Sequence, residues 1–149
     1  MDNSDTGTIG AMLEVEENMQ LGAPAQVVWN VIGNFGGLAD WHPAAVACVL
    51  SEKGPDTIRT ISIPGGGSLV EKLEAHDDEA MSQTYSIVDG PLPVANYLAT
   101  IRVVPESETS CRVKWVGHFE ASGAPDEMAQ NVVRGIYTAG LSALTDRFG

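Results

Sequence analysis

Positive charge is scarce in this sequence, where eight Lys and Arg residues stand against 20 Asp and Glu, for a formal net charge of −12. A surface of this sign repels a phosphate backbone and an anionic membrane, so we expect neither nucleic acid nor a membrane as a partner. No apolar segment approaches the roughly 18 residues that a membrane-spanning helix needs. The N-terminus is polar and acidic and has no basic flank, unlike a secretion signal. We therefore expect a cytoplasmic protein.

Cysteines and metal-ligand clusters are also sparse. Cys48 and Cys111 are too few for a disulfide framework, and each lies in a strand-like run where we interpret it as a small buried hydrophobe. The histidines are scattered, with no His or Cys pair at metal-ligand spacing: His42, His76 and His118. We predict no metal and no cofactor.

A long amphipathic helix is predicted at the C-terminal end, from Pro125 to Phe148. Apolar residues recur there every three or four positions, at Met128, Val132, Val133, Ile136, Tyr137, Leu141, Leu144 and Phe148. Pro125 suits the first helical position. Gly140 lies on the apolar side of this helix, where it either allows close packing against a neighbour or leaves room for a ligand, and we favour packing.

The remaining chain predicts mostly strands. We expect residues 1–8 to be disordered and residues 9–149 to form one domain, beginning with a half-buried strand over 9–21. A short helix with Val27, Val28, Val31, Ile32 and Phe35 on its apolar face and a helical turn at 38–43 follow. Six strands with turn residues between them come next, at 46–50, 57–63, 68–75, 83–88, 94–104 and 110–120. Short connections make them antiparallel neighbours, so we predict an α+β fold in which a curved seven-stranded antiparallel sheet wraps around the long helix.

Three segments resemble a known family. They are Phe35-Gly36-Gly37-Leu38-Ala39-Asp40-Trp41-His42-Pro43-Ala44-Ala45-Val46, then Glu71-Lys72-Leu73-Glu74-Ala75 with Asp77, and Tyr85-Ser86-Ile87 with Gly90-Pro91-Leu92-Pro93-Val94 and Asn96-Tyr97. They look like the bacterial polyketide cyclase/dehydrase-like proteins of the SRPBCC superfamily. The resemblance covers about residues 9–148. It implies the helix-grip fold of the birch pollen allergen, with two short helices after the first strand.

A more distant similarity is to the plant abscisic acid receptors. Their gate loop corresponds to residues 64–68 and their latch to residues 91–94. The similarity places Val46 where the receptors carry the lysine that anchors the hormone's carboxylate, and Gly140 where they have an asparagine. Trp115 stands in place of a second glutamate, which makes this pocket more apolar. The resemblance therefore implies a pocket with a mobile lid and a ligand other than abscisic acid.

Glu71 carries the strongest single indication of a site. Strand alternation puts it on the same face as Leu69 and Leu73, which we expect to point inward. Burial without a partner would raise the pKa of this carboxyl and make it a candidate general acid or base, or an anchor for a ligand hydroxyl or amine. The alternative is a buried ion pair with Arg59. In the receptors this position is a glutamate that holds the ligand through water, which favours binding.

Aromatic residues and one histidine complete the candidates. Alternation points Tyr85, Tyr97 and Trp115 inward, where they suit a flat hydrophobic ligand or simply fill the core. His42, in Trp-His-Pro near the expected cavity mouth, could move protons near neutral pH. We favour a structural role for it, with Asp40 as a partner.

We therefore expect a protein that binds a small hydrophobic molecule, aromatic or polyketide-like, in a cavity between the sheet and the C-terminal helix. The candidate ligand-binding residues are Arg59, Ile61, Ile63, Leu69, Glu71, Tyr85, Tyr97, Ala99, Trp115, Phe119, Val132, Ile136 and Gly140. The alternative is a cyclase, dehydratase or lyase in which Glu71 is the general acid or base and Tyr97 or His42 steadies an oxyanion. The expected partner is the ligand, and a homodimer is left open.

Overall fold

The computed structural model describes residues 12–149, so the predicted disorder of residues 1–8 lies outside this range. Its elements are β2 (Leu13–Leu21), α1 (Ala25–Ile32), the 3₁₀ helix η1 (Phe35–Asp40), β3 (Ala47–Lys53), β4 (Asp56–Ser62), β5 (Ser68–Asp77), β6 (Ser82–Asp89), β7 (Val94–Pro105), β8 (Cys111–Ala121) and α2 (Asp126–Phe148). The strands form one antiparallel sheet in the order β2-β8-β7-β6-β5-β4-β3. The predicted α+β helix-grip fold is confirmed.

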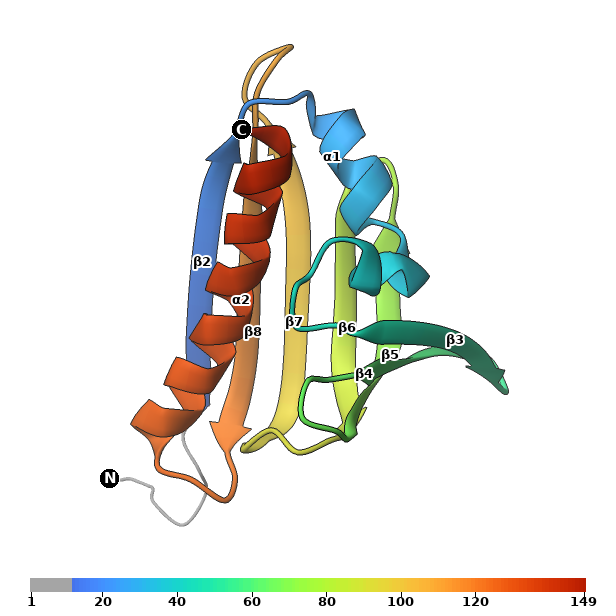
Figure 1. Ribbon diagram of the computed structural model, residues 1–149, viewed down its shortest axis with the longest axis vertical. Helices are drawn as coiled ribbons and strands as arrows, with labels where there is room; N and C mark the ends of the chain where they lie inside the picture. Colours follow the sequence, from blue (N-terminus) through green and yellow to red (C-terminus); the bar gives the residue numbers. More distant parts are fainter. Residues whose placement is uncertain (1–11) are drawn as a thin grey trace.

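The long helix covers only part of this sheet. α2 crosses the inner face over β2 and β8, while α1 and η1 lie over the other half, where α1 packs on β7 and η1 on β3 and β4 (Figure 1). The inner face of β4, β5 and β6 therefore lies beside α2 rather than under it. This uncovered stretch is where the fold leaves space.

Burial along α2 divides the predicted apolar stripe into two rows. Val133, Tyr137, Leu141 and Leu144 are buried against the sheet, together with Ala129 and Gly140. Val132 and Ile136 are half-buried and Met128 is exposed. The stripe is wider than the strip of sheet below it, so its second row faces the uncovered strands.

The helix α1 differs from its prediction. Its buried residues are Ala25, Val28, Trp29 and Ile32, whereas Val27 is 45 % exposed and Phe35 lies in η1. The buried positions follow the i, i+3, i+4, i+7 spacing of one helical face, and Val27 falls beside that face. The prediction that Val27 lies on the buried apolar face of this helix was therefore wrong. At the start of α2, Pro125 is the N-cap residue and not the first helical residue.

A β-bulge in β7 contains the candidate aromatic residue Tyr97. The pairing with β8 shifts between Ala95 and Leu98, and Asn96 takes a left-handed conformation with φ of 54°. The side-chain amide of Asn96 donates a hydrogen bond to Glu120 Oε2 at 2.8 Å. From Tyr97 onward, side chains alternate regularly between the two faces of the sheet, so Tyr97 and Ala99 are buried as predicted.

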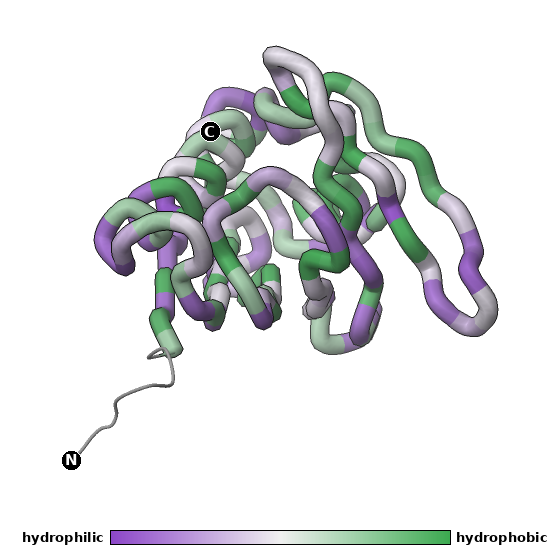
Figure 2. Tube along the Cα trace, turned by 90° about the horizontal axis from the view of Figure 1, so that it is seen from below, coloured by the Kyte–Doolittle hydropathy of each residue, from purple (hydrophilic) through white to green (hydrophobic). Residues whose placement is uncertain are grey.

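The edge strand β3 carries exposed apolar side chains. Val49 and Leu50 within it, and Val46 just before it, are 63 %, 47 % and 66 % exposed. The β3–β4 hairpin projects to the right in Figures 1 and 2, and hydrophobic segments run along it. The strand also extends to Lys53, three residues beyond its predicted end.

The two glycines within α2 predict opposite responses to alanine. A Cβ at Gly135 meets nothing within 4 Å, so Gly135→Ala is expected to raise the free energy of unfolding by up to about 1 kcal/mol. A Cβ at Gly140 meets ring atoms of His42 at 2.8 Å and Trp115 at 2.9 Å, so Gly140→Ala is expected to lower it by about 1–3 kcal/mol. Denaturant unfolding measures both changes. Equal stabilisation by the two substitutions would contradict the packing described for Gly140.

Candidate functional site

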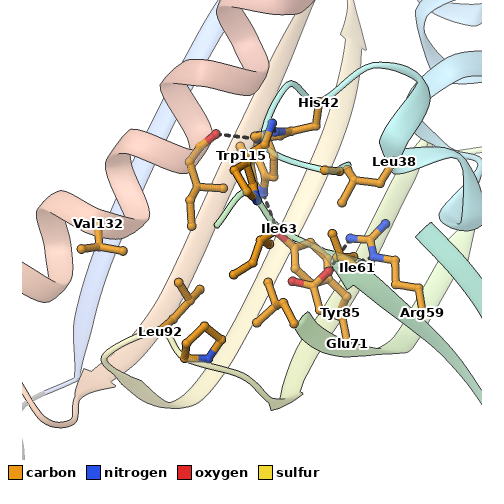
Figure 3. Close-up of a pocket in the computed structure, with 16 residues that line it drawn as sticks. Leu38, His42, Arg59, Ile61, Ile63, Glu71, Tyr85, Leu92, Trp115 and Val132 are labelled. Atoms are coloured by element: carbon orange, nitrogen blue, oxygen red, sulfur yellow. Dashed lines mark hydrogen bonds and ion pairs between the residues drawn. The ribbon is translucent and has the colours of Figure 1, made fainter. Parts of the chain in front are cut away.

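A cavity of about 270 Å³ lies between α2 and the uncovered part of the sheet (Figure 3). Its walls come from η1 and the segment after it, from β4, β5, β6 and β8, from α2, and from the β4–β5 and β6–β7 connections. The lining residues are Leu38, His42, Ala44, Ala45, Arg59, Ile61, Ile63, Pro64, Leu69, Glu71, Tyr85, Pro91, Leu92, Trp115, Val132 and Ile136. Most of this wall is apolar, and its few polar groups belong to His42, Arg59, Glu71, Tyr85 and Trp115.

The structure separates the candidate ligand-binding residues into two groups. Nine of them line the cavity: Arg59, Ile61, Ile63, Leu69, Glu71, Tyr85, Trp115, Val132 and Ile136. Four are not among the lining residues: Tyr97, Ala99, Phe119 and Gly140. The second group faces the same interior, in a region that other side chains fill.

Tyr137 fills much of that region. Its ring stacks on Trp115 with centroids 4.5 Å apart and planes 13° from parallel, and its hydroxyl bonds to that of Tyr97. The Tyr97 ring packs in turn on Phe119 at 5.8 Å. A Cβ at Gly117 would lie 2.1 Å from the Tyr137 hydroxyl, so only glycine at this place on β8 admits the phenol. At Gly140 the close packing that the sequence favoured is what the structure shows, with His42 and Trp115 as the neighbours.

Several lining residues were not among the predicted ligand contacts. They are Leu38, Ala44, Ala45, Pro64, Pro91 and Leu92, while His42 was named only as a catalytic candidate. Pro64, Pro91 and Leu92 belong to the loops compared with the receptor gate and latch, so that resemblance already pointed to them. The sequence predicted a helical turn at 38–43 with His42 near the cavity mouth, but no local pattern indicated that Leu38, Ala44 and Ala45 also line the cavity.

Arg59 and Glu71 form a buried ion pair at one wall. They are direct partners in the β4–β5 register and are 4 % and 5 % exposed. Arg59 Nε and Nη2 both reach Glu71 Oε1, at 2.8 and 2.7 Å, and Nη1 donates to the Phe35 carbonyl at 3.0 Å. The guanidinium also lies over the Phe35 ring at 4.1 Å and the Tyr85 ring at 5.0 Å. The pair left open as an alternative is therefore present, and aromatic rings enclose its positive partner.

The carboxyl of Glu71 keeps one oxygen free of protein contacts. Oε1 accepts a hydrogen bond from Arg59 Nε and forms the ion pair with Nη2, whereas Oε2 accepts no hydrogen bond from residues 12–149. Burial raises the pKa of Glu71, and the charge of Arg59 and its hydrogen bond offset part of that rise. Because Glu71 lines the cavity, its carboxyl can accept a hydrogen bond or a proton from a bound molecule.

Three tyrosines and Trp115 form a buried hydroxyl network. Trp115 Nε1–H donates to the Tyr85 hydroxyl at 3.0 Å, and the Tyr85 and Tyr97 hydroxyls are 3.5 Å apart. Burial raises the pKa of Tyr85, Tyr97 and Tyr137 well above the ordinary value of a phenol, so all three stay protonated at neutral pH. Of the three, only Tyr85 borders the cavity.

Both ring nitrogens of His42 are engaged. The Ala44 N–H donates to Nδ1 at 3.1 Å, so Nδ1 carries no proton, and Nε2–H donates to the Ile136 carbonyl at 2.8 Å. Burial lowers the pKa of His42, which keeps the ring neutral at pH 7. The prediction that Asp40 is the partner of His42 was wrong, because both ring nitrogens of His42 bond to backbone groups and Asp40 is exposed. His42 instead ties the segment after η1 to α2.

Residues 12–149 contain no cluster of metal-binding side chains and no helix that could span a membrane. No three His, Cys, Asp or Glu side chains in this range come together as metal ligands would. No helix in it is long and apolar enough to cross a membrane. The absence of a metal, a cofactor and a membrane partner stays a prediction.

A double-mutant cycle tests whether the ion pair acts as a unit. Arg59→Met leaves the Glu71 charge buried without a partner, and Glu71→Leu does the same to Arg59. Each is therefore expected to lower the free energy of unfolding by about 3–5 kcal/mol. The double variant removes both charges and is expected to recover most of the loss. Simple addition of the two single effects in denaturant unfolding would contradict direct pairing.

Comparison with known proteins agrees with this architecture. The chain is 32% identical over 123 residues to MLP-like protein 423 of Arabidopsis thaliana, covering 75% of this chain and 77% of that protein. Its structure matches the protein XoxI of Bacillus cereus with a TM-score of 0.86 and 36% identity, over 91% of this chain and 94% of XoxI. The Zhui aromatase/cyclase of Streptomyces sp. R1128 shares the fold with a TM-score of 0.75 and 17% identity, over 92% and 93% of the two chains.

The family follows from the sequence match. Residues 12–149 match the family model described as polyketide cyclase / dehydrase and lipid transport, which spans every residue that the structure describes. The resemblance inferred from the Trp-His-Pro segment and the Glu71 strand is thereby confirmed. This chain belongs to the polyketide cyclase/dehydrase and lipid transport family.

Proposed function

We propose that this protein binds a small hydrophobic molecule, aromatic or polyketide-like, in the cavity between the sheet and α2. The observation that carries the proposal is an apolar cavity with one buried charged pair in its wall. Its volume of about 270 Å³ is slightly below the roughly 300 Å³ at which ligand pockets usually begin, so the ligand is small. The family description names cyclases, dehydrases and lipid transport, and all of these handle hydrophobic molecules.

The polar wall favours a ligand that donates a hydrogen bond. Glu71 Oε2 is an acceptor without a protein donor among the described residues, so a ligand hydroxyl or amine would satisfy it. A ligand carboxylate would instead meet the charge of Glu71 beside an Arg59 that is already paired. A hydroxylated aromatic molecule is the simplest class that fits both the apolar lining and this acceptor.

The β4–β5 and β6–β7 loops could open to admit the ligand to the cavity. Pro64 from the β4–β5 connection and Pro91 and Leu92 from the β6–β7 connection contribute to its wall. Gly65, Gly66 and Gly67 have φ of 86°, 96° and 91°, and a Cβ on any of them would touch nothing. A loop of this kind has few contacts to hold it in place, so we propose that it moves when the ligand enters.

One observation also favours an enzyme of the dehydratase or cyclase kind. Glu71 combines a raised pKa with an oxygen that no described residue occupies, as a general acid or base requires. In a dehydration it would take a proton from the substrate and return one to the departing hydroxyl, which leaves as water. His42 has both nitrogens engaged and Tyr97 does not line the cavity, so Glu71 is the catalytic candidate whose geometry fits this role.

Filling the cavity tests the binding proposal. Val132 lines it from α2, so Val132→Trp is expected to lower the affinity for naphthol at least about tenfold by occupying the space. Met128→Trp is the matched control, because Met128 lies one turn earlier on the same helix, is 55 % exposed and does not line the cavity. Isothermal titration calorimetry measures both affinities. Equal affinities in the two variants, or no binding by the unmodified protein, would contradict the proposal.

A Glu71→Gln variant separates binding from catalysis. Glu71→Gln keeps the shape and an oxygen for Arg59, so a pure binder is expected to change in affinity only. An enzyme that acts on a hydroxylated polyketide analogue would release water, which mass spectrometry detects as a loss from the substrate, and Glu71→Gln would stop that loss without stopping binding.

A further inference from the structure

We propose that Trp115 sets the upper size limit of the ligand and thereby selects short, flat hydroxyaromatic molecules over longer fused-ring ones. This inference rests on the proposed binding function and names the residue that determines its specificity. The proposed size limit follows from the position of the Trp115 indole, which lies between the cavity and the part of the interior that other side chains fill. Trp115 and His42 lie at one end of the group of lining residues, and Leu92 at the other (Figure 3).

The indole separates the cavity from Tyr137. Trp115 lines the cavity and Tyr137 does not, yet the two rings stack with centroids 4.5 Å apart. One face of the indole is therefore covered by Tyr137, and part of its remaining surface borders the cavity. Behind it lie Tyr137, Tyr97 and Phe119, a continuous aromatic group in which neighbouring rings or hydroxyls are in contact.

Four neighbours hold the indole in place. Its Nε1–H donates to the Tyr85 hydroxyl at 3.0 Å, and the Trp41 ring packs on it at 5.9 Å. The His42 ring packs perpendicular to it, with centroids 6.1 Å apart and planes at 86°, and the indole Cζ3 lies 2.9 Å from where a Cβ of Gly140 would be. Trp115 is 3 % exposed, so a rotation away from the cavity would collide with these groups. The wall is therefore fixed, and a ligand cannot lengthen the cavity by displacing it.

The space that the indole now occupies would suit an aromatic ring of a ligand. Replacing the indole by a smaller side chain would uncover the face of Tyr137, on which a further ring of a ligand could stack as Trp115 does now. The volume freed is roughly that of one aromatic ring. The number of fused rings that the protein accepts is therefore expected to rise by one.

A ligand series tests this directly. The probes are phenol, naphthol and hydroxyanthracene, which carry one, two and three rings, and calorimetry gives their affinities for the intact protein, Trp115→Leu and Phe119→Leu. The readout is the ratio of affinities between hydroxyanthracene and naphthol. Loss of the hydrogen bond to Tyr85 affects both probes alike, and so does a general loss of stability.

Trp115→Leu is expected to raise this ratio at least about tenfold. Phe119→Leu is the matched control, because Phe119 is a buried aromatic residue on the same face of β8 that does not line the cavity. It is expected to leave the ratio unchanged. Trp115→Phe frees less space and is expected to change the ratio in the same direction by a smaller factor, which keeps the test valid if Trp115→Leu does not fold.

The outcomes are distinguishable. Binding of naphthol with an unchanged ratio in both Trp115 variants would overturn the role of Trp115 and leave the proposed function standing. An equal rise of the ratio in Phe119→Leu would also overturn it, because the limit would then belong to the whole interior. Failure of the intact protein to bind any of the three probes would contradict the proposed function itself.

Discussion

The structure depends on one geometrical constraint, which is that a single helix cannot cover a curved sheet of seven strands. α2 has 23 residues and packs on β2 and β8, at one side of the sheet. The inner face of β4, β5 and β6 must be closed by other parts of the chain, namely η1, the segment containing His42 and two loops. These parts meet imperfectly, and the cavity is the space that they leave.

Aromatic side chains and glycines decide where this space ends. Tyr137 and Trp115 fill the interior between α2 and β8, and they do so because Gly117 and Gly140 offer no side chain at the two points where the rings approach the backbone. In another part of the cavity wall, Arg59 and Glu71 place a charged pair beside apolar surface. Burial of such a pair is unfavourable unless both partners are well bonded. Arg59 meets that condition through its contacts to Glu71, the Phe35 carbonyl and two aromatic rings, whereas Glu71 Oε2 accepts no hydrogen bond from residues 12–149.

Strand alternation predicted much of the site from the sequence, because it reports which face of a sheet a side chain occupies. It placed Glu71, Trp115 and Tyr97 in the interior, and all three are buried. It could not tell which interior residues border empty space, since that depends on how rings from other elements fill the interior. Tyr97 and Phe119 were therefore grouped with Trp115 although Tyr137 and Trp115 separate them from the cavity. The partner of His42 is a carbonyl 94 residues away on α2, which no local pattern indicates.

The proposed function requires a hydrophobic ligand to occupy this cavity with its polar group toward Glu71. A crystal structure of the protein with naphthol would show whether it does. We expect naphthol between α2 and the β4–β6 strands, with its hydroxyl within hydrogen-bonding distance of Glu71 Oε2 and its rings against Ile61, Leu69 and Ile136. Naphthol bound only elsewhere, or a cavity that holds only water at saturating naphthol, would contradict it.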